Sequence, residues 1–319
     1  MTWTRPKVAN SVTFNPGLLD SSHIALSWAL IFMLLAAILK ARVFEKYFVR
    51  FSLSARLTCE TKIPKVKTMN KTKQSLLALT AGLFLTTNVS AVEPDWKPYA
   101  DLLSSVVKQG TKQDVSLAMV DYATLKENGK INAVYQKLSV YPVSKLQGKQ
   151  EKLAFYINIY NVLALKMVVD NWPLTSIKDV GSLLSPVWSR EAGIIDGKTI
   201  SLDDIENKVL RPMAEPRIHL AIVCASVSCP DLRTEAYTPE RLEAQLDDQM
   251  KTFLANKGKG MKIDASKVYL SSIFKWFEED FGGVLRFITH YVSPSEQKIL
   301  DEGKLKISYL DYNWDLNGL

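Results

Sequence analysis

The chain has 319 residues, 47% of them hydrophobic, so it is long enough to bury a substantial core. Its formal net charge is +7, but the basic residues are unevenly distributed. Residues 1–91 contain 12 Lys and Arg against 3 Asp and Glu, whereas the remainder contains 28 against 30. Because this remainder is nearly neutral, we expect no nucleic-acid partner.

Two apolar stretches lie in the N-terminal region. Residues 24–39 carry no charge and precede several basic residues, a pattern typical of a short membrane helix. Residues 69–91 combine a basic start, an apolar segment and small residues before position 92, which predicts a secretory signal peptide. Because signal peptides are N-terminal, Met69 is predicted to be the true start, with residues 1–68 being translated upstream sequence. The alternative is a real tandem leader that anchors the chain in the inner membrane through residues 24–39.

Both arrangements export residues 92–319, so we expect a periplasmic domain in a compartment where disulfides persist. Contact with a membrane is expected only through residues 24–39. The substrate or protein partner is left open by the sequence.

Residues 92–319 alternate between helical and strand patterns in chain order. Helices are predicted over 96–107, 151–170, from 201, from 238, over 273–281 and over 284–291. A hairpin is predicted around Asp196-Gly197, and strands over 218–223, 261–264 and 267–272. The run 218–223 is apolar without alternation, which favours a central strand buried on both faces. Together these elements predict one α+β domain, with a mixed, mainly antiparallel sheet packed by several helices.

The segment 217–233 contains Cys224, Cys229 and His219, while the third cysteine, Cys59, lies in the leader. In an extended strand His219 and Cys224 point to opposite faces. Cys229 lies beyond a turn, and Pro230 could begin a helical turn whose N-terminus stabilises a thiolate. Cys229 is therefore the predicted nucleophile with His219 as its nearest base, and His219 is expected closer to Cys229 than to Cys224.

Other interpretations of the two cysteines remain open. They could form a disulfide that closes the loop, stay buried as inert thiols, or bind a metal. A metal site would lack a fourth ligand, because His290 is the only other histidine after residue 91. We therefore expect neither a metal nor another cofactor.

Asn158 and Asn161 stand three residues apart and so share one face of the apolar helix over 151–170. Because a buried amide needs hydrogen-bond partners, the simpler interpretation is that both side chains fix neighbouring backbone. The functional alternative is that one of them orients the His219 imidazole or donates to an oxyanion.

Two further features are interpreted as structural. Arg217 opens the buried run and is predicted to pair with a carboxylate of the preceding helix, either Glu206, Asp203 or Asp204. The stretch "FKWFEEDF" supplies several aromatic residues, which at this spacing belong more often to a core than to a ligand platform.

Five stretches in this order resemble the family known as domain of unknown function 547: "FYINIYNVLALKMV", "ISLDDIENKVLR", "PRIHLAIVCASVSCPDLR", "IFKWFEEDF" and "YLDYNWDLN". The resemblance runs from about residue 122 to 317 and implies one domain, found in exported bacterial proteins and as a module of larger eukaryotic chains. It implies no reaction. The family's signature positions are occupied here by Asn158, Asn161, Glu206, Arg217, His219, Cys224, Ser226 and Cys229.

Two functions from different classes follow. The first is a thiol-dependent hydrolase or transferase that uses Cys229 and His219, oriented by Asn158. The second is a non-catalytic binding or scaffold domain with a Cys224–Cys229 disulfide and a purely structural set of polar residues. The distance between the two sulfur atoms discriminates between them, because a bonded pair lies about 2 Å apart.

Overall fold

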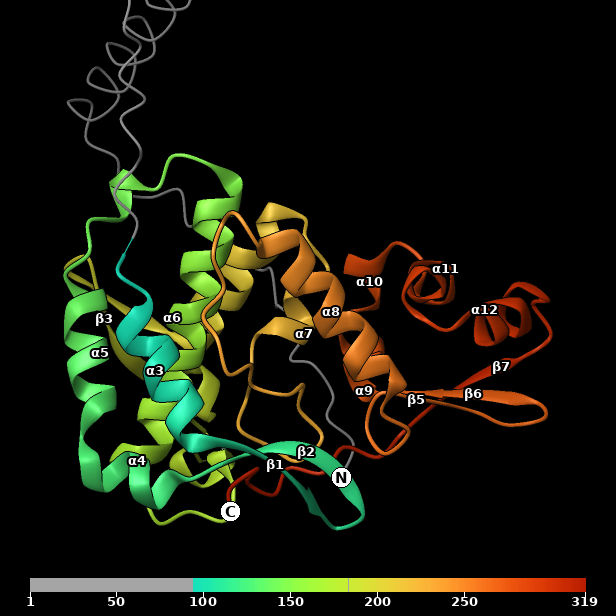
Figure 1. Cartoon of the computed structure of the whole chain (residues 1–319), viewed down its shortest axis with the longest axis horizontal. Helices are drawn as coiled ribbons and strands as arrows, with labels where there is room; N and C mark the ends of the chain where they lie inside the picture. The colour runs from blue at the N-terminus through green and yellow to red at the C-terminus, as the bar shows by residue number, and fades with distance from the viewer. Residues whose placement is uncertain (1–93, 183) are drawn as a thin grey trace, which may run out of the picture. The chain divides into compact units, whose positions relative to one another are not determined.

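The structure, a computed structural model, describes residues 94–182 and 184–319, which belong to one unit of the chain (Figure 1). The apolar segment at 24–39 and the signal peptide over 69–91 lie outside the described residues, as does Cys59. Their export and membrane roles therefore stay predictions.

The long apolar helix is confirmed as α6 (Lys149–Asp170), and nearly all of its apolar residues are buried. It contacts α4 (Tyr122–Asn128), α5 (Lys130–Ser139) and a β-hairpin, while α3 (Lys97–Val106) packs against α4 and α5 (Figure 1). In the described part of the chain, α6 alone is long and apolar enough to cross a membrane, yet 83% of its most apolar window is buried inside the fold. The helix ends before the cis Trp172–Pro173 bond, as the proline predicts.

The α+β class is confirmed, but the strands of the described residues form three small sheets instead of one mixed sheet. The antiparallel pairs are β1 (Val107–Lys112) with β2 (Val115–Val120) and β3 (Glu191–Ile195) with β4 (Lys198–Ser201). In the third sheet β6 (Lys267–Leu270) pairs antiparallel with β5 (Met261–Ile263) and parallel with β7 (Lys306–Tyr309). The predicted Asp196-Gly197 turn joins β3 to β4, and both residues have positive φ, 50° and 73°.

Further helices supply most of the remaining regular structure, and all of them except α8 are short. They are η1 (Val143–Lys145), η2 (Ile177–Val180), η3 (Val187–Ser189), η4 (Asp204–Leu210), η5 (Arg211–Met213), α7 (Ile218–Ala221), α8 (Leu242–Ala255), α9 (Ser272–Trp276), α10 (Glu278–Phe281), α11 (Val284–Ile288), η6 (Thr289–Tyr291) and α12 (Pro294–Asp301). The helix predicted over 273–281 is thus divided into α9 and α10. The helix predicted from residue 238 begins at Leu242, after a turn.

The strand predicted over 218–223 is wrong, because its first four residues form α7. The predicted burial is confirmed, since all six residues from 218 to 223 are buried. An apolar run of this length fits a buried helix as well as a buried strand, and periodicity alone does not distinguish the two. Among the strands of the described residues none pairs with this run, and backbone groups at the end of α7 are hydrogen-bonded by a side chain of α6.

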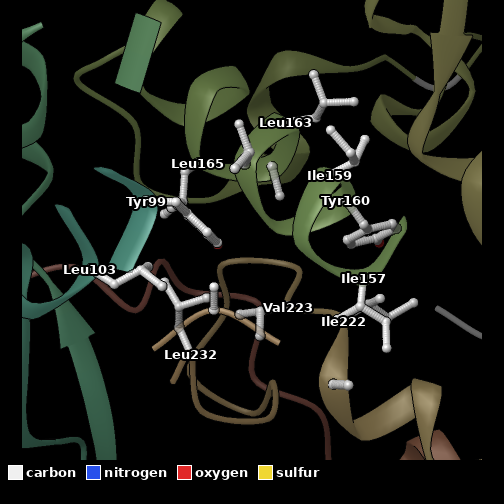
Figure 2. Close-up of a cluster of buried hydrophobic side chains, with 14 of the residues drawn as sticks. Tyr99, Leu103, Ile157, Ile159, Tyr160, Leu163, Leu165, Ile222, Val223 and Leu232 are labelled. Atoms are coloured by element: carbon white, nitrogen blue, oxygen red, sulfur yellow. The ribbon is translucent and has the colours of Figure 1, made fainter. Parts of the chain in front are cut away.

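Two hydrophobic clusters meet at α7. The first surrounds α6 and includes Ile218 and Ala221. The second lies between α8, β5, β6 and α9–α12 and includes Leu220. Figure 2 shows Ile222 and Val223, which directly follow α7, among side chains of the first cluster. The segment that carries the cysteines is therefore fixed between the two cores.

Candidate functional site

Asn158 and Asn161 fix the backbone on both sides of the cysteine segment. The Asn158 amide donates to the carbonyl of Tyr237 (2.8 Å) and accepts from its N–H (2.9 Å). The Asn161 amide donates to the carbonyl of Ala221 (3.0 Å) and accepts from the N–H of Val223 (2.8 Å). The backbone interpretation is therefore confirmed, and these amides are not directed at His219.

The loop from Cys224 to Cys229 is a tight turn. Ala225 has a φ of 58°, an uncommon conformation for a residue with a side chain, and the N–H of Cys229 donates to the carbonyl of Ser226 (3.0 Å). The turn brings both sulfur atoms to the same side, with Sγ to Sγ at 2.8 Å. Both cysteines are free, since a disulfide would require about 2.05 Å.

The two thiols have different environments. Cys229 is buried with 2% exposure, and its Sγ accepts a hydrogen bond from the backbone N–H of Cys224 (2.8 Å). Cys224 is partly exposed and lies within hydrogen-bond distance of Ser226 Oγ (3.3 Å) and Tyr312 Oη (3.1 Å). Cys224 is thus the thiol that both solvent and hydroxyl donors reach.

These environments push the two thiol pKa values apart. Burial raises the pKa of Cys224, but its hydrogen bonds with Cys229, Ser226 and Tyr312 together outweigh burial and lower that pKa below its ordinary value. Burial raises the pKa of Cys229 well above its ordinary value, and the adjacent sulfur of Cys224 raises it further. The first proton of the pair is therefore lost from Cys224.

The C-terminal segment, residues 310–319, delivers Tyr312 to this site. It is held against the cysteine loop by the N–H of Val227 to the carbonyl of Asp315 (2.8 Å) and by the N–H of Asn317 to the carbonyl of Ala225 (3.1 Å). The Ser226 hydroxyl donates to Tyr312 Oη (3.1 Å), which leaves the phenol hydrogen available for Cys224. A chain of hydroxyl groups therefore ends at the Cys224 sulfur.

His219 belongs to a separate polar cluster. Its Nε2 lies 2.7 Å from Oδ2 of Asp280, and its ring stacks on Phe277 with 3.9 Å between centroids. Asp280 also accepts two hydrogen bonds from Arg211 (2.6 and 2.9 Å), and the hydrogen bond from Arg211 lowers the pKa of Asp280. The imidazole is 1% exposed, and one edge of it is held by Asp280 of α10, which Arg211 of η5 binds in turn.

The other edge of the His219 ring faces Glu206. The distance from Nδ1 to Oε1 is 3.5 Å, and Nδ1 makes no hydrogen bond with the described residues. The negative charge of Glu206 also acts on the thiol site, where it adds to the effect of burial in raising the pKa of Tyr160 and opposes ionisation of Cys224. The charge of Glu206 thus acts on both polar clusters.

The predicted partners of Arg217 are wrong. Its guanidinium binds Glu215 (2.7 Å), Glu243 (2.6 Å) and Asp247 (2.6 Å) instead of a carboxylate of η4. The helical path of α7 explains the difference, because it directs Arg217 toward α8. The expected structural ion pair is present, but its carboxylates come from Glu215, two residues before Arg217, and from α8.

Two parts of the predicted catalytic geometry are also wrong. Residues 230–233 form no helix, so Cys229 does not lie at a helix N-terminus. His219 meets Asp280, Glu206 and two aromatic rings, and no hydrogen bond or ion pair joins it to either thiol. The described residues contain no group of three or more His, Cys, Asp or Glu side chains suited to a metal.

Tyr312 and Asp280 were not selected from the sequence. Each lies within a stretch that carries the family resemblance, "YLDYNWDLN" and "IFKWFEEDF", but their partners are 88 and 61 residues away in the chain. Only the fold joins them to Cys224 and His219.

A comparison with protein-family models identifies part of this architecture. Residues 143–254 match the model described as "Protein of unknown function, DUF547". The expected resemblance is therefore confirmed over α6, α7, the cysteine loop and most of α8. Tyr312 and Asp280 lie outside the DUF547 match. No curated protein and no solved structure matches the chain.

Proposed function

We propose that this domain is a thiol-dependent transferase in which Cys224 is the attacking thiolate. Cys224 is a partly exposed residue, and the observation that carries the proposal is the position of its Sγ atom, 3.1 Å from a phenol hydroxyl and 2.8 Å from a second thiol. Hydrogen-bond donors stabilise a thiolate, and the thiolate is the nucleophilic form of cysteine.

The choice of Cys224 over Cys229 follows from exposure and protonation. Cys229 is buried, and its pKa is raised because burial disfavours the charged form. Cys224 is reachable from solvent and ionises first. We therefore assign Cys224 as the nucleophile. Cys229, which the sequence predicts as the nucleophile, becomes the second thiol of the pair.

Transfer is favoured over hydrolysis by the position of His219. A hydrolase needs a base that activates water beside the thiol, whereas the His219 side chain is 1% exposed and its polar partners are Asp280 and Glu206 instead of a thiol. A thiolate already stabilised by hydroxyl donors attacks without such a base. Export through the signal peptide over 69–91 would place this chemistry in the periplasm.

Alkylation with iodoacetamide, resolved by peptide mass spectrometry, tests the proposal. In the full-length chain without reductant, Cys224 is expected to react with an apparent pKa below the ordinary value of about 8.5, because hydroxyl donors stabilise its thiolate. Cys229 is expected to stay unmodified over the same pH range, because it is buried and protonated.

Denatured protein is the matched control, since both thiols then regain ordinary pKa values and react alike. Reaction at Cys229 before Cys224 would refute the assignment. A requirement for reductant before either thiol reacts would instead favour the scaffold function with a Cys224–Cys229 disulfide. Equal and slow labelling of both thiols would indicate inert buried cysteines.

A further inference from the structure

We propose that Cys224 and Cys229 form a dithiol–disulfide couple, and that the group attacked by Cys224 is a disulfide. This inference rests on the proposed function, because it assigns an electrophile and a second thiol to the same nucleophile. It gives Cys229 the role of resolving thiol, which releases the product from Cys224.

Proximity is the first argument for a resolving role. Cys229 Sγ lies 2.8 Å from Cys224 Sγ, so a group bound to Cys224 can be attacked with little movement of the loop. The backbone on both sides is fixed, because Asn161 holds Val223 and the Ser226 carbonyl accepts from Cys229. The second thiol is thus preorganised for an intramolecular attack.

The two thiol environments suit the order of the two attacks. Cys224 is partly exposed and can meet a substrate from solvent, whereas Cys229 is buried in the first hydrophobic cluster with its sulfur beside that of Cys224. The backbone N–H of Cys224 donates to Cys229 Sγ at 2.8 Å, so it can stabilise negative charge that develops on that sulfur during the second attack.

The chemistry balances as two successive exchanges. The Cys224 thiolate forms a bond to one sulfur of R–S–S–R′ while the S–S bond breaks, and R′–S⁻ leaves and takes up a proton. Cys229 then loses its proton and attacks Cys224 Sγ, and R–S⁻ leaves and takes up that proton. The substrate disulfide is reduced to two thiols, and the cysteine pair is oxidised to a disulfide. A thiol co-substrate regenerates the dithiol by the reverse exchange.

The test uses the full-length chain with Cys59→Ser, so that only the two site cysteines react. The protein is reduced, freed of reductant and mixed with one equivalent of 5,5′-dithiobis(2-nitrobenzoate). Each protein molecule is expected to release both nitrothiobenzoate groups and retain no adduct, with the mass reduced by two hydrogen atoms.

Cys229→Ser separates the two steps. This variant is expected to release one nitrothiobenzoate group and retain the other as a stable mixed disulfide at Cys224. Cys224→Ser is expected to lose the fast reaction. If the variant with Cys229→Ser does not fold, the stoichiometry of the parent protein still decides the question.

The two proposals fail in different ways. Release of one group with a persistent adduct in the parent protein would overturn the disulfide couple while leaving Cys224 as the nucleophile. Absence of a fast reaction, together with no alkylation of Cys224, would overturn the proposed function itself. Oxidised glutathione and a disulfide-linked peptide then distinguish small-molecule from polypeptide disulfides by their relative rates.

Discussion

Tyr312→Phe is expected to slow the first attack of Cys224 on 5,5′-dithiobis(2-nitrobenzoate) about threefold to tenfold at low pH. Loss of a hydrogen bond to a charged group is worth about 1.5–3 kcal/mol, which raises the thiol pKa by about one to two units. The thiolate fraction then falls, but each thiolate becomes more nucleophilic, with a Brønsted coefficient of about 0.4–0.5. At a pH below the Cys224 pKa of both the parent protein and the variant, the net loss of rate is the product of these opposing changes.

The same substitution is expected to accelerate the reaction at a pH above the Cys224 pKa of both the parent protein and the variant. Cys224 is then fully ionised in both proteins, and the thiolate of the variant is the more nucleophilic. Stopped-flow rates across the pH range measure the crossover. Tyr309→Phe is the matched control, since Tyr309 precedes the C-terminal segment and its ring contacts Lys275 instead of a cysteine. A uniform slowing at every pH would mean that Tyr312 acts only by holding the segment in place.

His219→Ala is expected to lower the free energy of unfolding by about 3–5 kcal/mol. The substitution removes a ring buried against Phe277 and Phe281, and it deletes a hydrogen bond to the charged Asp280. The rate of the Cys224 reaction is expected to change less than about twofold, because no hydrogen bond or ion pair joins the imidazole to a thiol. Urea unfolding and the rate of nitrothiobenzoate release measure the two effects separately.

His219→Gln is the conservative control, because its amide can still donate to Asp280 and it fills part of the ring's volume. This variant is expected to lose less stability than His219→Ala and to keep the same thiol reactivity. A large loss of Cys224 reactivity in a stably folded variant would instead make His219 the catalytic base that sequence reasoning predicted.

The elements with strong local signals could be predicted from the sequence. The apolar length of α6, the stop at Pro173 and the Asp196-Gly197 turn each depend on residues within a few positions of one another. Burial of residues 218–223 was also evident, but not their conformation. The backbone of a strand needs a partner strand for its hydrogen bonds, whereas the end of α7 is hydrogen-bonded by the amide of Asn161. Tertiary contacts therefore decide between the two conformations.

The candidate site was predicted by its residues but not by its geometry. The cysteines, His219 and both asparagines were selected for their chemistry, yet the alternation argument assumed a strand. Residues 218–221 form a helix instead, and His219 therefore meets Asp280 from α10. Tyr312 could not be found from spacing, because its contact with Cys224 spans 88 residues.

The order in which the two site thiols ionise tests the central claim most directly. Selective ¹³C labelling of cysteine Cβ atoms in the full-length chain allows each thiol to be titrated by NMR, with the signals assigned through Cys224→Ser and Cys229→Ser. We expect Cys224 to titrate below the ordinary pKa of a cysteine thiol and Cys229 to stay protonated well above it. Ionisation of Cys229 before Cys224, or signals of a disulfide in protein kept free of oxidant, would contradict it.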